Sequence, residues 1–192
     1  MDLRKKLSVF AIALFSFYFL LKVVDWFLAD VSYSRGRAMA DAGYLFEAEK
    51  SFRKATSLWP KEPAYHRELA VVYAHLAQVS ADEEKAQFLD LTSLEAKKTL
   101  DLNPRNLLSL KSLVSTYFTL AQIDPSYQVQ TENIVQRAIT LCPTDPTLWY
   151  FKALVLLGEE REDQAKLALD EALRLKPDYV KAKEAKDLLP VL

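Results

Sequence analysis

The sequence predicts an all-α protein in which one N-terminal membrane helix is followed by an α-solenoid of about four helix pairs and a closing helix. Three observations support this prediction. Only three glycines occur among 192 residues and runs of β-branched residues are scarce, which favours helix. The first thirty residues contain a long apolar run. Four later segments end in the same short pattern, each closed by a proline, as in arrays of repeated helix pairs.

The apolar run has the length of a membrane helix. From Leu7 to Leu21 only two serines interrupt the apolar residues, and a helix from Leu7 to Ala29 would be about 34 Å long, against a bilayer core of about 30 Å. Lys22 and Trp26 would then lie near the far interface, where lysine can snorkel and tryptophan is enriched. We therefore predict a basic tail and retained anchor over residues 1–28, with membrane contact over residues 7–29.

Two alternatives to an anchor stay open. A cleaved signal peptide fits the basic start and the apolar run, but no small-x-small cleavage site follows that run. A helix packed on the rest of the protein is disfavoured because residues 9–21 are apolar on every face. Basic residues 4–6 precede the span and favour a cytoplasmic N-terminus, although Arg35 and Arg37 weaken this bias. The expected location is a bacterial inner membrane, crossed once, with the solenoid on the extracytoplasmic side.

The repeated pattern divides residues 29–192 into similar units. Each unit ends in a small residue, an apolar residue three positions later and a proline two positions after that; these prolines are Pro60, Pro104, Pro143 and Pro177. A helix stops there because the residue before proline disfavours α geometry. The predicted units are 29–62, 63–106, 107–145 and 146–179, followed by a capping helix over 180–192 whose lysines would keep the end of the array soluble.

The first and last units resemble the 34-residue tetratricopeptide repeat. In residues 29–62 the small position is Gly36, the turn position is Gly43, and the second-helix positions are Ala48, Phe52 and Ala55. In residues 146–179 the large aromatic position is Trp149, the small position is Ala153, and the second-helix positions are Ala165, Leu169 and Ala172. Three positions depart from the pattern: Arg35, Lys152 and the early Gly158.

The two middle units are longer than the family period. Residues 63–106 carry about ten extra residues, and the capping-box spacing of Ser80-Ala81-Asp82-Glu83 places the start of a lengthened second helix there. Residues 107–145 carry about five extra residues around Asp124-Pro125. The apolar spacing within these units predicts amphipathic helices without the resemblance; an irregular helical bundle is the alternative. No Gly or Pro interrupts residues 7–35, so the membrane helix is expected to continue into the first repeat.

No pattern in the sequence indicates an enzyme, a cofactor, a metal or a small-molecule substrate. There is no phosphate-binding glycine loop, no HExxH and no nucleophile elbow. His66 and His75 lie nine residues apart on one predicted helix, on opposite faces, so they cannot share a metal; His66 is expected at an aromatic packing position. The single cysteine, Cys142, excludes an intrachain disulfide and is predicted to be buried. A net charge of −1 argues against nucleic acid as a partner.

Protein or peptide binding is the function that remains. The resemblance implies a concave groove lined by first helices, with side chains facing it at Tyr33, Arg37, Arg67, His75, Lys111, Ser115 and Tyr150. Aromatic rings beside cations would suit an extended peptide. An equally weighted alternative is that these residues are only the solvent-exposed side of a scaffold.

Three functions are therefore compared. The leading prediction is a membrane-anchored scaffold that mediates protein–protein interactions without catalysis. The alternative is the C-terminal, non-catalytic repeat region of a bacterial O-antigen ligase or polymerase-like membrane glycosyltransferase, which the membrane helix followed by repeats loosely resembles. The third is a secreted, soluble scaffold after signal cleavage.

Overall fold

The computed structural model describes residues 3–189, with side chains from Leu7 onward except that of Val9. The basic side chains of residues 4–6 and the last three residues of the predicted capping helix lie outside this part. The described chain is all-α. Its elements are α1 (Leu3–Asp41), α2 (Leu45–Leu58), α3 (Pro63–Val79), α4 (Asp82–Leu102), α5 (Leu107–Ile123), the 3-10 helix η1 (Pro125–Tyr127), α6 (Gln128–Leu141), α7 (Pro146–Gly158), α8 (Glu162–Leu175) and α9 (Val180–Asp187).

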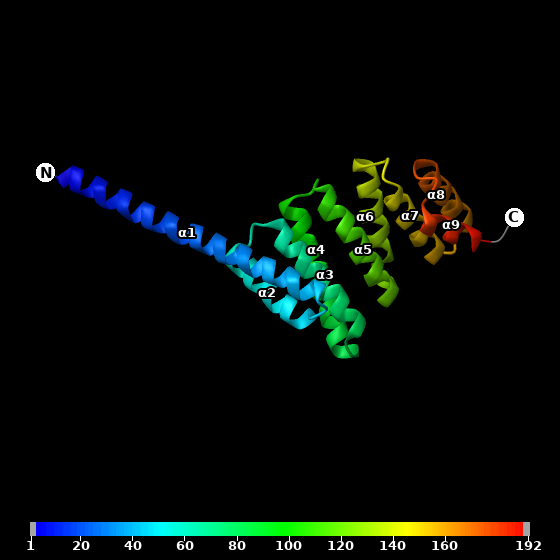
Figure 1. Ribbon diagram of the computed structural model, residues 1–192, viewed down its shortest axis with the longest axis horizontal. Helices are drawn as coiled ribbons and strands as arrows, with labels where there is room; N and C mark the ends of the chain where they lie inside the picture. Colours follow the sequence, from blue (N-terminus) through cyan, green and yellow to red (C-terminus); the bar gives the residue numbers. More distant parts are fainter. Residues whose placement is uncertain (1–2, 190–192) are drawn as a thin grey trace.

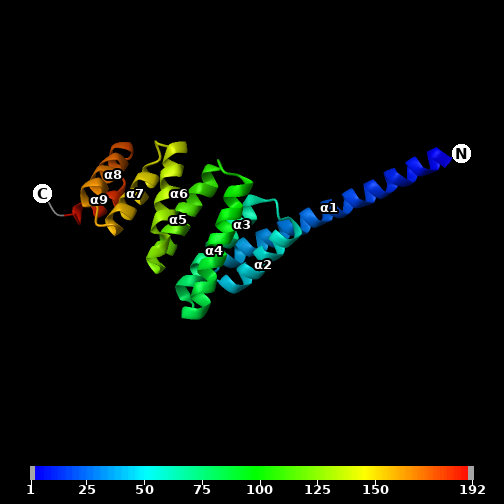
Figure 2. The ribbon, with the colours of Figure 1, turned by 180° about the vertical axis from the view of Figure 1, so that it is seen from behind.

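The helices form four stacked pairs, α1–α2, α3–α4, α5–α6 and α7–α8, with α9 against the last pair (Figures 1 and 2). Each pair contacts its neighbours in the series. The buried apolar side chains accordingly fall into four clusters along the array, not one central core. This arrangement confirms the predicted all-α fold of paired helices and excludes the irregular bundle.

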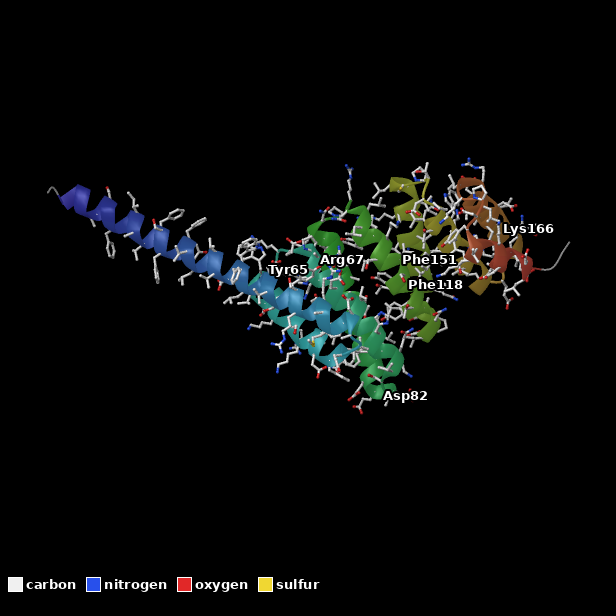
Figure 3. The ribbon with its side chains drawn as sticks, in the orientation of Figure 1. Tyr65, Arg67, Asp82, Phe118, Phe151 and Lys166 are labelled. Atoms are coloured by element: carbon white, nitrogen blue, oxygen red, sulfur yellow. The ribbon has the colours of Figure 1, made fainter. Side chains whose placement is uncertain are left out.

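Helix α1 is one uninterrupted element of 39 residues, as the absence of Gly and Pro from residues 7–35 predicts. Its first half projects from the array (Figure 1), and its large apolar side chains from Phe10 to Leu28 are exposed. Within the described residues it is the one helix long and apolar enough to cross a membrane. From Ala29 onward its apolar side is covered by α2 and α3, and Ala29 itself is fully buried with Ala55 and Tyr65 (Figure 3).

The lengthened second unit differs from the prediction in how it begins. Helix α4 has 21 residues, against 14 in each of α2, α6 and α8, and it starts at Asp82 as expected. The predicted capping box is wrong, because Ser80 ends α3 and its backbone N–H donates to the Leu76 carbonyl, while Ala81 is the N-cap residue and makes no side-chain cap bond. The capping-box spacing located the boundary but not the bond that forms it.

Two other local features refine the prediction. The extra residues of the third unit form η1, which begins with the Asp124 side chain accepting from the Ser126 N–H. Cys142 is only partly buried, which corrects the expected burial. It is the C-cap residue of α6, where the helix turns away from the core, so its side chain packs at the edge of the central cluster.

The turn between α7 and α8 places a non-glycine residue in the left-handed region. Glu160 has φ 58°, whereas the α1–α2 turn has Gly43 at φ 82°. The left-handed conformation costs a residue with a Cβ about 1–2 kcal/mol. Glycine avoids this cost but loses more conformational entropy on folding. Glu160→Gly is therefore expected to raise the free energy of unfolding by about 0.5–1 kcal/mol. Thermal unfolding by circular dichroism would measure this. Gly43→Glu should act in the opposite direction, and a destabilising Glu160→Gly would contradict the argument.

Candidate peptide-binding surface

The first helices of the pairs form the inner side of the array. α1 contacts α3, α3 contacts α5 and α5 contacts α7, while within the described chain no comparable contact joins α2 with α4, α4 with α6 or α6 with α8. Helices that pack closely lie on the inside of a curve, and those that diverge lie on the outside. The seven predicted groove residues all lie on these inner helices.

Three of the seven lie together on α1 and α3. The Tyr33 ring packs between Phe52 and Tyr65, with centroids 5.8 and 4.9 Å away, and burial raises the pKa of its hydroxyl, which is within hydrogen-bonding reach of Arg37. Arg37 is exposed. Arg67 is buried and donates twice to Glu68, over 3.2 and 2.8 Å (Figure 3). Only Arg37 of this group therefore offers an accessible, unpaired charge.

His75 and Ser115 meet in the middle of the array. Both are exposed, and they line one shallow pocket of about 130 Å³ between α3 and α5, with Val71, Ala74 and Ser112. The His75 ring makes one long contact, 3.4 Å, from its Nδ1 to the Gln78 side chain. This pocket combines a ring nitrogen and hydroxyls with an apolar floor, a set that can hold one side chain of a bound peptide.

The last two predicted residues serve partly as structural groups. The Lys111 ammonium lies 2.6 Å from Asp145, whose carboxylate also accepts from the Thr147 N–H as the N-cap of α7. Burial opposes ionisation of Asp145, but these two bonds outweigh it and lower its pKa. Tyr150 is half-buried, with its ring 5.4 Å from that of Tyr179. Lys111 therefore joins two pairs of the array, and Tyr150 packs against α9.

Sequence reasoning did not identify a wide groove that lies across α2, α3 and α4. It has a volume of about 740 Å³ and contains the buried pair His66 and Glu95. His66 Nδ1 lies 2.5 Å from Glu95 Oε2 and Nε2 lies 2.9 Å from the Pro60 carbonyl. Trp149 makes the equivalent bond, its indole N–H donating to the Pro143 carbonyl at 2.7 Å. His66 thus occupies the expected aromatic position.

The sequence carries a signal for half of this arrangement. In both cases a ring N–H lies six residues after the proline that ends the preceding helix, which fixes the bond to the proline carbonyl. Glu95 lies on α4 and meets His66 only through the register of α4 on α3, which no local pattern encodes.

Comparisons with known proteins agree with this geometry. Residues 146–179 match the family model of the tetratricopeptide repeat, and no protein of curated function matches the chain. YrrB, described as a tetratricopeptide-repeat protein with an unusual peptide-binding site, superposes with a TM-score of 0.66 at 18% identity, over 83% of this chain and 75% of YrrB. A tetratricopeptide-repeat protein of Thermus thermophilus gives 0.70 at 18% identity, over 83% and 79%. Pseudomonas aeruginosa pilF gives 0.61 at 22% identity, over 84% and 74%.

These matches decide between the alternatives only in part. None of them is to an enzyme family, and they do not show the resemblance to O-antigen ligases. At these identities the solved structures establish the fold alone. The chain therefore has the fold of tetratricopeptide-repeat proteins, and residues 146–179 carry the sequence pattern of that repeat.

Proposed function

We propose that this protein is a membrane-anchored scaffold that binds an extended peptide segment of its partners on the inner side of the array and catalyses no reaction. The binding proposal is supported most directly by accessible polar groups beside a small pocket on the inner side. Arg37, His75 and Ser115 are exposed on the inner helices, and His75 and Ser115 line the same pocket. The peptide-binding description of YrrB supports the same use of this fold.

The anchor is the exposed apolar half of α1. An uncovered apolar helix of this length is stable in lipid and unfavourable in water. We place residues 7–28 in the membrane, because Ala29, the last residue of the predicted membrane contact, is buried in the array. The array lies on the extracytoplasmic side of a bacterial inner membrane, and α1 continues from one into the other. A protease added to spheroplasts should then digest the array without lysis; protection of the array would reverse the orientation.

The binding proposal is tested by charge changes that leave the fold intact. The variant Arg37→Glu/His75→Glu/Ser115→Glu alters exposed residues only, whereas Arg67 and Lys111 are unsuitable because they hold Glu68 and Asp145. In a crosslinking pull-down from membranes, the yield of specific partners should fall at least about tenfold, the equivalent of about 1.4 kcal/mol. The matched control Lys97→Glu/Asn133→Glu/Gln136→Glu places the same charges on the exposed side of α4 and α6 and should keep the partners. Identical partner lists for both variants would remove the groove from the proposal.

A further inference from the structure

The free end of the array has a groove that the proposed function does not use. It lies between α1 and α2, has a volume of about 330 Å³, and is lined by Val31, Ser32 and Arg35 from α1 and by Glu47, Lys50 and Lys54 from α2. It faces away from α3, because Arg35 is two residues, and so slightly more than half a turn, from Tyr33, whose ring contacts Tyr65 of α3. Within residues 3–189, helices after α3 make no comparable contact with α1 or α2.

The charges of this groove are mostly positive and unpaired. Arg35, Lys50 and Lys54 are all exposed, and none of them forms an ion pair within the described chain. The one carboxylate among the lining residues is Glu47. By contrast, the next cation on α2, Arg53, lies 3.3 Å from Glu49. Three free cations around one hollow form a site for anionic groups.

The position of the groove along α1 indicates where the anion comes from. The array begins at Ala29, which is fully buried beside Ala55, directly where the exposed apolar half of α1 ends. Arg35 is six residues further, about 9 Å along the helix, and its side chain tilts back toward the helix N-terminus. Because α2 runs antiparallel to α1, Lys54, the neighbour of Ala55, returns to the level of Ala29. The headgroup layer extends about 5–7 Å beyond the hydrocarbon core, within reach of both side chains.

We propose that Arg35, Lys50 and Lys54 bind the phosphate groups of anionic lipids at the membrane surface from which α1 emerges. This proposal rests on the proposed membrane anchor. Its consequence is that α1 tilts toward the side of the groove, because the lipid contacts lie on that side of the helix. The inner surface, reached from the opposite side of α1 through Tyr33 and Arg37, is then turned away from the lipid and open to a partner.

A second copy of the chain is a less suitable occupant. Stacking of copies end to end would bring α9 to this groove, and α9 exposes Lys181 and Lys183. Because Glu184 and Asp187 are exposed there as well, α9 offers the three cations of the groove no net opposite charge. An anionic lipid surface offers the opposite charge over the same area.

The test uses the full chain in lipid nanodiscs and measures the acetylation rate of individual lysines by mass spectrometry. In discs that contain phosphatidylglycerol, Lys50 and Lys54 should react about fivefold more slowly than in discs of phosphatidylcholine alone, since each lysine near an anionic surface is held by roughly that factor. Lys97, exposed on α4, should react equally in both. High salt should remove the difference.

A charge-reversal variant extends the test. In Arg35→Glu/Lys54→Glu, Lys50 should lose its slow reaction in anionic discs, whereas the matched control Lys97→Glu/Arg105→Glu should keep it. If the chain elutes with the discs but Lys50 and Lys54 each react at the same rate in both lipids, the lipid-binding proposal is overturned while the membrane anchor stands. Failure to elute with them removes the anchor itself. Slow reaction that follows protein concentration instead of lipid composition indicates a second copy and also overturns it.

Discussion

Replacing Phe52 by alanine is expected to lower the free energy of unfolding by about 3–5 kcal/mol, because the ring fills the junction of the first pair and would leave a cavity. Phe52 is fully buried, and its ring packs on that of Tyr33. It also lies directly over Gly36, where an added Cβ would come within 2.7 Å of two ring carbons. The same ring therefore supplies the packing and requires the glycine.

Because of this double role, the effect of Gly36→Ala on the free energy of unfolding should change sign when Phe52 is replaced. In the wild-type background Gly36→Ala should cost about 1–3 kcal/mol, because the buried ring cannot move aside. In the Phe52→Ala background the space is empty, and the same substitution should instead stabilise by up to about 1 kcal/mol through the helix propensity of alanine. Hydrogen exchange of the α2 amides in detergent or nanodiscs measures both steps. If Gly36→Ala were equally harmful in both backgrounds, Phe52 would not be the reason for the glycine.

Those parts of the fold that depend on local pattern could be predicted from the sequence. The helix-ending prolines placed the four pairs, and the packing positions of Gly36 and Phe52 followed from the resemblance to the tetratricopeptide repeat. The continuity of α1 followed from the absence of helix breakers. The left-handed turn residue was not predicted, because Gly158 drew attention to the turn but lies inside α7, whose C-terminal turn leaves Glu160 with the positive φ.

The candidate surface was less predictable because side-chain pairing depends on neighbours that the pattern does not show. Spacing places Arg67 on an inner helix, but its guanidinium is occupied by Glu68. Lys111 likewise meets Asp145 across two units. The basic groove was missed for another reason: Arg35 and Lys54 are nineteen residues apart in sequence and become neighbours only through the antiparallel return of α2. The departure at Arg35 from the family pattern was its only local signal.

The buried pair of His66 and Glu95 should show the largest effect of any polar side chain in the described array. Burial opposes the ionisation of Glu95, but hydrogen bonds from His66 and Lys98 outweigh it and lower the pKa of the carboxyl group. Glu95 is therefore a carboxylate that accepts from His66 Nδ1 and, at 2.7 Å, from the Lys98 ammonium. Because the Pro60 carbonyl can only accept, His66 Nε2 must donate to it. The His66 ring therefore bridges the Pro60 carbonyl and the buried Glu95 carboxylate.

Removing one partner leaves the other in an apolar setting, so the two single substitutions should differ. His66→Leu strands a buried carboxylate with only Lys98 and should cost about 3–5 kcal/mol. Glu95→Gln should cost about 1 kcal/mol or less, since its amide can donate to the Nδ1 of a neutral ring. The double variant His66→Leu/Glu95→Leu should recover much of the loss, because no buried charge remains. A double variant as unstable as the sum of its parts would show that packing, not charge, holds this site.

The dependence of stability on pH follows from the lowered pKa of Glu95. A carboxyl group with a lowered pKa in the folded state adds stability above its ordinary pKa of 4.5, and this stability is lost as the pH falls through the folded value. The stability advantage of the wild type over Glu95→Gln should therefore be largest near neutrality and should decline below about pH 4.5. Denaturant unfolding of both proteins between neutral and acidic pH would measure it. His66 and Glu95 join α3 to α4 and to the loop after α2. If the stability advantage of the wild type stayed constant at acidic pH, the Glu95 carboxyl group would not be ionised in the folded protein.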